Sequence, residues 1–223
     1  MYFIYKYLKS LIFINTLLLL QKMFTEIVLP NDNEQEFIEI ASKLNIKKLY
    51  FLYDFDEEKV ERKLNLIRQH KNIEIKTGFI INQKNINKAL QQSKLLVAKS
   101  SDKDRFFIES KKIKLIYGFE EIYKKDYMHQ RASGLNHIIC ELASKNNVTI
   151  GFSYSSLFNK NPADTPLLIG RMMQNITLCQ KYKVKTAIGS FSDKPFDLRA
   201  TYDIASLFAM LGMDGKRIKE SLT

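Results

Sequence analysis

From residue 24 onward, short apolar segments with strand composition alternate with amphipathic helical segments. The strand-like segments are residues 24–29, 48–53, 73–81, 95–98, 114–118, 148–152 and 185–190. Apolar residues at helical spacing fill most of the intervals between them. Repeated strand–helix units with short connections form a parallel sheet that helices cover. The alternation therefore predicts a single-domain α/β fold, a small β/α (TIM-like) barrel, with a doubly wound open sheet as the alternative.

Apolar residues three and four positions apart mark the predicted helices. The stripes are Phe37, Ile40, Ala41 and Leu44; Leu135, Ile138, Ile139 and Leu142; Leu168, Met172, Ile176 and Cys179; and Ile204, Leu207, Phe208 and Leu211. Asp56 should cap a further helix with Val60, Leu64 and Ile67 facing inward, and Asp214 should cap the last one. Shorter helices are expected at 84–92 and 103–109.

The first 22 residues do not fit this alternation. Lys6 and Lys9 precede a run, Leu11 to Leu20, that is apolar apart from Asn15 and Thr16. The pattern is similar to a signal peptide but lacks a small-residue cleavage site, and the run is short for a membrane span. We expect residues 1–22 to be an apolar leader outside the fold, with Met23 as the true start and residues 23–223 as the barrel domain. A membrane-associated protein that uses this leader is the alternative.

The chain is strongly basic, with 35 Lys and Arg residues against 24 Asp and Glu residues and a pI near 9.4. Many lysines can simply solvate helix faces. An excess of this size in one domain nevertheless favours a polyanionic partner, most simply nucleic acid. Cys140 and Cys179 lie in apolar helical patterns, so we expect buried thiols, no disulfide and a reducing cytoplasm.

Polar residues follow the predicted strands, where a β/α barrel places its ligand-facing groups. They are Asn31, Asp32, Asp54, Asn82, Lys99 to Ser101, Glu120, Ser153, Ser155 and Ser190 to Asp193. The chain has only three histidines, His70, His129 and His137, and no His-x-His pair. We therefore expect no metal site and no catalytic residue, since multinuclear barrel hydrolases need several converging His and Asp ligands. No Gly-x-Ser-x-Gly elbow, P-loop or Rossmann glycine pattern occurs.

A polar cluster opens the helix that follows Tyr127. It contains His129, Gln130, Arg131, Ser133 and Asn136, and the strand after this helix ends in Gly151-Phe152-Ser153. Ser133 and Gly134 could receive a phosphate on backbone N–H groups, but a plain N-cap is the commoner meaning of such a serine.

Several of these segments resemble a known family. They are His129-Gln130-Arg131-x-Ser133-Gly134-Leu135-Asn136-His137, Ile150 to Ser153, Gly170 to Asn175, Cys179-x-Lys181-Tyr182, Ser190, Ser192-Asp193, Leu198-Arg199, Ala205 to Leu207 and Leu211 to Met213. In combination they resemble the protein component 3 family of archaeal ribonuclease P, whose eukaryotic counterpart is the thirty-kilodalton subunit. The resemblance runs from about Met23 to the C-terminus and is most specific in the second half.

The resemblance implies a barrel related to the polymerase-and-histidinol-phosphatase superfamily, without the full metal-ligand set of that superfamily. It implies a non-catalytic protein subunit that binds and orders the catalytic RNA, which removes the 5′ leader from precursor tRNA. Magnesium is expected on the RNA and no cofactor on the protein. The implied partners are the RNase P RNA, precursor tRNA, a second small protein subunit and other archaeal subunits, with no membrane. A metal-dependent phosphoesterase is the alternative.

Arginine offers bidentate phosphate contacts and stacking on unpaired bases, and arginines are few here among many lysines. The expected RNA-binding residues are Arg105, His129, Arg131, His137, Arg171, Lys181 and Arg199. Further polar residues of the matching segments are Gln130, Ser133, Asn136, Ser153, Gln174, Asn175 and Ser190. Surface ion pairs or structural hydrogen bonds are the alternative roles for all of them.

Overall fold

The computed structural model describes residues 24–55, 73–158 and 161–222. Its strands form one seven-stranded sheet in the order of the sequence. They are β1 (Thr25–Val28), β2 (Lys48–Asp54), β3 (Glu74–Ile80), β4 (Leu96–Lys99), β5 (Leu115–Tyr117), β6 (Thr149–Ser153) and β7 (Thr186–Gly189). Every neighbouring pair is parallel. The predicted strands are confirmed, with ends that differ by at most one residue.

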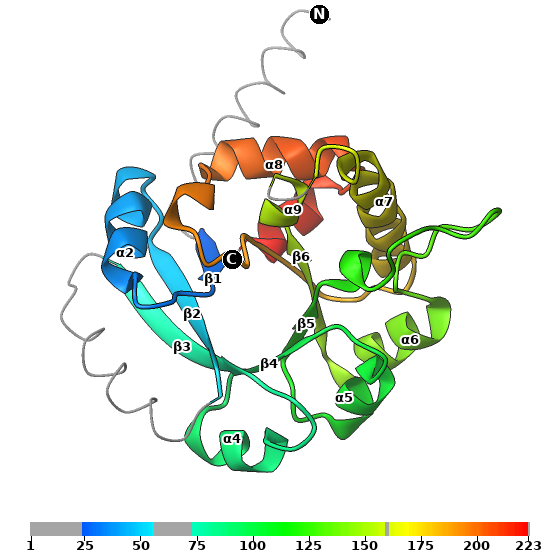
Figure 1. The fold of residues 1–223 in the computed structure, drawn as a ribbon, viewed down its shortest axis with the longest axis horizontal. Helices are drawn as coiled ribbons and strands as arrows, with labels where there is room; N and C mark the ends of the chain where they lie inside the picture. The colour runs from blue at the N-terminus through cyan, green and yellow to red at the C-terminus, as the bar shows by residue number, and fades with distance from the viewer. Residues whose placement is uncertain (1–23, 56–72, 159–160, 223) are drawn as a thin grey trace, which may run out of the picture.

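The sheet curves until its first and last strands meet. Phe191, just after β7, donates its N–H to the Ile27 carbonyl of β1 at 2.8 Å, and Leu29 donates to Ser192 at 2.9 Å. Figure 1 shows the strands as a ring with the helices outside it. The predicted β/α barrel is therefore confirmed over the open sheet. We call the junction of β1 with β7 the closing seam.

Helices connect the strands on the outside of the ring (Figure 1). They are α2 (Glu34–Lys43), α4 (Ile86–Gln92), α5 (Asp104–Ser110), α6 (His137–Asn146), α7 (Thr165–Lys181), α8 (Thr201–Met210) and α9 (Gly215–Ser221). Single 3₁₀ turns follow three strands, as η1 (Phe119–Glu121), η2 (Ser155–Leu157) and η3 (Pro195–Asp197). The helix expected after Asp56, the leader 1–22 and His70 lie outside the described residues. None of the helices in the described ranges combines the length and the apolar character of a membrane span.

Burial follows the predicted stripe in α7 but departs from it in α6. Leu168, Met172, Ile176 and Cys179 are all buried. In α6, by contrast, Ile138 is exposed and Leu135 precedes the helix. The Asn136 side chain accepts a hydrogen bond from the Ile139 N–H at 2.9 Å, so the helix begins two residues later than the apolar stripe suggests.

Two apolar layers stabilise the barrel. The larger layer lies between the sheet and the surrounding helices and includes both cysteines, which are buried free thiols as predicted. The smaller one fills the barrel interior with Ile27, Leu52, Val97, Leu115, Tyr117 and Phe191. Within it the rings of Tyr117 and Phe191 stack with their centroids 4.3 Å apart. Ile27, Leu52, Val97 and Leu115 of this layer also line a cavity of about 210 Å³, so the apolar interior is only partly filled.

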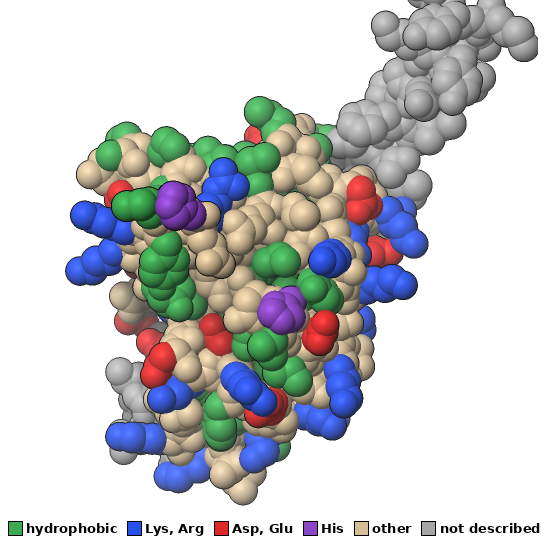
Figure 2. Space-filling model, turned by 90° about the vertical axis from the view of Figure 1, so that its right-hand side faces the viewer, with side chains coloured by type: hydrophobic (Ala, Val, Ile, Leu, Met, Phe, Trp, Pro, Cys, Tyr) green, Lys and Arg blue, Asp and Glu red, His purple; other side chains and the backbone are tan. Residues whose placement is uncertain are grey.

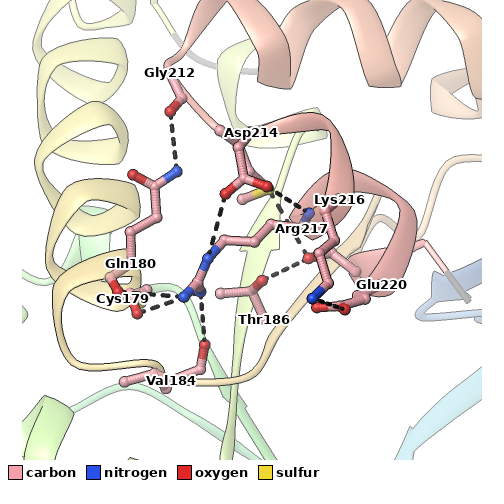
Figure 3. Close-up of polar contacts among 11 residues, drawn as sticks. Cys179, Gln180, Val184, Thr186, Gly212, Asp214, Lys216, Arg217 and Glu220 are labelled. Atoms are coloured by element: carbon pink, nitrogen blue, oxygen red, sulfur yellow. Dashed lines mark hydrogen bonds and ion pairs between the residues drawn. The ribbon is translucent and has the colours of Figure 1, made fainter. Parts of the chain in front are cut away.

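The last helix is fixed to the end of α7 by one arginine (Figure 3). The Arg217 guanidinium donates to the carbonyls of Cys179, Gln180 and Val184 at 3.2–3.4 Å. Cys179 and Gln180 lie in the last turn of α7, whose carbonyls lack helical partners, and Val184 lies in the connection to β7. Asp214 accepts from the Arg217 N–H at 3.0 Å, which confirms its predicted capping role.

Candidate nucleic-acid interface

A pocket of about 180 Å³ opens at the carboxyl ends of the strands. Its polar lining includes Lys99, Ser153, Ser155 and Asp193, four of the residues predicted to share this end of the barrel. The prediction for Glu120 is wrong, because Glu121 lines the pocket instead.

Most of the pocket's hydroxyl groups are already used by the backbone. Ser153 Oγ and Ser155 Oγ both donate to the Ser190 carbonyl, at 2.7 and 2.6 Å. Ser190 Oγ donates to the Ile27 carbonyl at 3.1 Å. Ser153 and Ser190, predicted as polar positions of the site, are therefore buried residues that hold the ends of β6 and β7 together.

A carboxylate lies inside the closing seam. Glu26 is fully buried, and its Oε1 accepts from the N–H groups of Ser190 and Ile27 at 2.6 and 2.9 Å. Its Oε2 accepts from the Tyr154 hydroxyl at 2.8 Å. Burial raises the pKa of Glu26 to about 7, although these hydrogen bonds act in the opposite direction. The overlooked sequence signal for this group is an acidic residue in the middle of an otherwise strand-forming segment.

The loop between β5 and α6 is attached to α7 by Arg171. Its Nε donates to Asp126 Oδ1 at 2.8 Å, and its Nη1 donates to the carbonyls of Glu120 and Tyr123 at 2.9 and 2.7 Å. Its side chain is only 1% exposed. The structure therefore gives Arg171 a buried structural role, one of the two roles that the sequence left open for it, and does not present its guanidinium at the surface.

Asn175, one turn after Arg171, fixes the same loop. Its amide nitrogen donates to Glu120 Oε1 and to the Ser133 carbonyl, both at 2.8 Å. Burial raises the pKa of Glu120 to about 7, against the effect of this amide. Asn175 thus reaches Ser133 from α7. Ser133 is buried, and the N-cap of α6 is Asn136 instead.

The outer part of the loop carries the predicted residues that face solvent. Tyr127 and Gln130 join through mutual backbone hydrogen bonds of 2.9 and 3.4 Å, a tight turn that exposes His129. Arg131 is also exposed and lies over Gly170 of α7, where an added Cβ would be 3.0 Å from its Nε. His137 is exposed at the start of α6.

Figure 2 views this α6–α7 side and shows the histidines among hydrophobic and basic side chains. Exposed apolar residues occur on the same elements, namely Tyr123, Tyr127, Met128, Ile138 and Met173. We call the surface made by these five residues with His129, Arg131 and His137 the loop face. It combines apolar and cationic groups.

The remaining predicted residues do not join the loop face. Lys181 lies eleven residues beyond Gly170, about 16 Å along α7, with its Nζ 5.4 Å from the Tyr182 ring centre. Arg105 forms a 2.8 Å ion pair with Glu109 on α5. Arg199 lies beyond β7, and Gln174 is half-buried on α7. The structure thus divides the predicted residues among several surfaces.

Comparisons with known proteins agree with this geometry. A family model described as RNase P subunit p30 matches residues 30–223. Ribonuclease P protein component 3 of Thermococcus kodakarensis is 33% identical over 89 residues, which cover 40% of this chain and 40% of that protein. The same component of Thermococcus gammatolerans is 31% identical over 119 residues, 53% of this chain and 52% of that protein. The chain thus matches about half or less of the length of these relatives.

Two solved structures share the fold. A chain from a cryo-EM structure of archaeal ribonuclease P with mature tRNA aligns with a TM-score of 0.69 at 15% identity, covering 87% of this chain and 85% of that chain. Histidinol phosphate phosphatase from Lactococcus lactis, complexed with zinc, L-histidinol and phosphate, aligns with a TM-score of 0.59 at 10% identity, covering 86% and 95%. At these identities the likeness concerns the fold alone.

Proposed function

The chain belongs to the RNase P subunit p30 family, and from this membership we propose that it is a protein subunit of ribonuclease P. In this role it binds and orders the RNA that removes the 5′ leader from precursor tRNA, and the protein itself performs no cleavage. The single observation that carries the proposal is the family match over residues 30–223.

The charge of the chain supports an RNA partner. Its formal net charge is +11. A folded RNA brings its phosphates close together, and cationic side chains offset their mutual repulsion. Arg131, His129 and His137 are exposed on the loop face and can donate to phosphate or 2′-hydroxyl oxygens. Magnesium would act on the RNA.

The loop face also suits a protein partner. Its Met128 is 92% exposed and its Tyr127 63% exposed, and both lie on a loop that Arg171 and Asn175 hold in place. Apolar and aromatic residues beside cationic ones are typical of the central part of protein interfaces. We assign the apolar part of this face, made by Tyr123, Tyr127, Met128, Ile138 and Met173, to a second small RNase P protein, and leave its cationic residues to RNA. The other archaeal subunits, precursor tRNA and a cytoplasmic location complete the proposal.

Metal-dependent phosphoester hydrolysis has no donor set to support it. Over residues 24–55, 73–158 and 161–222 no group of three or more His, Cys, Asp and Glu side chains could hold a metal ion. The polar groups at the barrel mouth are mainly hydroxyls that already bond to backbone carbonyls. These residues do not fit the metal site that related barrels use, so we derive no hydrolytic step.

Reconstitution of tRNA processing tests the proposal. The purified chain should cleave no precursor tRNA on its own, and it should increase cleavage by the RNase P RNA when the second small subunit is present. Omission of magnesium should abolish that cleavage. Cleavage of precursor tRNA by the protein without RNA would contradict the proposal, as would unchanged RNA-dependent cleavage with and without the chain.

A further inference from the structure

Two phenylalanines are exposed on the turns that follow β6 and β7. Phe158, directly after η2, is 52% exposed, and Phe196 in η3 is 81% exposed. An exposed ring contributes nothing to the core, so a pair of them close to one arginine needs a further explanation.

Arg199 lies between the two turns and is held in one orientation. Its Nη1 donates to the carbonyls of Phe196 and Leu198, at 2.8 and 2.9 Å. Its guanidinium carbon lies 5.3 Å from the centre of the Phe158 ring, which is cation–π geometry. The side chain therefore joins both phenylalanine-bearing turns.

The segment below this arginine is anchored in the closing seam. The Arg199 backbone lies close enough to the Tyr154 hydroxyl to lower its pKa, and that hydroxyl donates to Glu26. Pro195 and Leu198 on either side of Phe196 are buried. The exposed ring is thus presented by a rigid backbone, which lowers the entropy lost when a ligand binds.

Exposed aromatic faces beside an ordered guanidinium suit one ligand chemistry best, an unpaired nucleobase. A base stacks on aromatic rings and on arginine planes while its polar edges stay in water. An apolar protein surface would instead have to desolvate the Arg199 charge. Paired bases in a duplex have no free face to offer.

We infer that Phe158, Phe196 and Arg199 form a stacking platform for an unpaired base of the bound RNA. The inference rests on the proposed function in requiring an RNA ligand, and it adds the kind of nucleotide and its place on the barrel. The three platform residues are distinct from those of the loop face.

Fluorescence of a single-stranded adenylate oligonucleotide that carries one 2-aminopurine tests the platform on the full chain. Stacking should quench the fluorescence on binding.

Phe196→Leu keeps an apolar side chain without a π-face, and it should weaken binding roughly 5-fold or more, as expected for the loss of one aromatic stack. Phe196→Trp should bind at least as well as the original chain, and Arg199→Ala should bind more weakly. Phe106→Leu, at another exposed phenylalanine on α5, is the matched control and should change nothing. A thermal melt of each variant checks that it is folded.

The possible outcomes separate the two proposals. Equal oligonucleotide affinity for Phe196→Leu and Phe196→Trp would overturn the platform, as would no quenching at all. If the reconstituted enzyme still needs the chain in that case, the proposed function survives without the platform. Loss of assembly with a protein subunit, while oligonucleotide binding persists in Phe196→Leu, would assign the rings to a protein contact and also overturn the inference.

Discussion

The Tyr154 hydroxyl donates to Glu26 Oε2 across the closing seam, at 2.8 Å between residues that are 128 positions apart in the sequence. Glu26 also accepts from the Ser190 N–H, 164 positions away. One buried carboxylate therefore joins β1 to both β6 and β7, and it does so where no continuous strand ladder links the first strand to the last.

The stability of the chain should fall as the pH rises from about 5 to 8. Burial raises the pKa of Glu26 from 4.5 to about 7, so between these values the folded protein holds a proton that the unfolded chain has released. Protonated Glu26 contributes fully to the free energy of unfolding below pH 4.5. This contribution is lost as the pH rises through about 7, a change on the order of 3 kcal/mol. Glu120 has a similarly raised pKa and adds a change of the same sign.

Urea denaturation at several pH values measures this slope. Glu26→Gln keeps the shape of the side chain and should make the slope distinctly smaller, with Glu120 responsible for the remainder. Glu36→Gln, at an exposed position on α2, is the control and should leave it unchanged. An identical slope in Glu26→Gln and the original chain would mean that Glu26 is charged in the folded protein throughout.

Arg171→Ala should destabilise the fold by about 3 kcal/mol, because it leaves Asp126 and two loop carbonyls without their buried donor. Denaturant melts measure the loss, and hydrogen exchange should show that it includes the loop between β5 and α6. The salt dependence of RNA binding by the folded fraction should be unchanged. A fully stable variant with a flatter salt dependence would instead restore Arg171 as a phosphate contact.

Arg131→Ala should leave the stability of the fold unchanged and weaken RNA binding, the reverse of what we expect for Arg171→Ala. The side chain is exposed and lies over Gly170, so its removal should hardly change the melting temperature. Binding to the RNase P RNA should weaken, and the slope of log affinity against log salt should fall by about one unit for one lost phosphate contact. Lys145→Ala, at an exposed position near the end of α6, is a charge-matched control. The same salt dependence of RNA affinity in Arg131→Ala and Lys145→Ala would show that Arg131 does not contact the RNA.

Gly134→Ala should destabilise the protein by about 3 kcal/mol. Gly134 has φ +82°, and an added Cβ would lie 2.3 Å from the Phe119 carbonyl oxygen, so both strain and collision oppose the substitution. Gly212→Ala separates the two causes, since Gly212 has φ +93° but nothing within 4 Å of the added atom. That control should cost about 1 kcal/mol, from backbone strain alone. Equal losses would show that the loop moves away from the new methyl group.

The sequence predicted the elements of the fold better than the roles of its polar residues. Strand composition and the α7 stripe are local signals, and both were confirmed because each residue's burial follows from its own element. The burial of Arg171 depends on a loop 45 to 51 positions earlier in the chain, which no periodicity reveals. Ile138 is exposed although it belongs to the predicted stripe, because α6 packs inward through Ile139, Cys140 and Ala143.

Exposure agrees with the sequence for three of the expected RNA-binding residues. His129, Arg131 and His137 were expected from their polar surroundings and all three are exposed, while their role in RNA binding stays a prediction. Phe158 and Phe196 were overlooked, because phenylalanine in a sequence is ordinarily read as core and only the folded chain shows which rings face solvent.

The strand order has a consequence for how the barrel is made. Six of its ladders join strands that follow one another in the chain, so each can form as soon as its second strand has been synthesised. The closing seam and the bond from the Thr25 N–H to the Leu222 carbonyl must wait for the far end of the chain. On the ribosome we therefore expect an incomplete ring with β1 as a free edge, which nascent-chain proteolysis would detect as susceptibility that persists until β7 and α9 emerge.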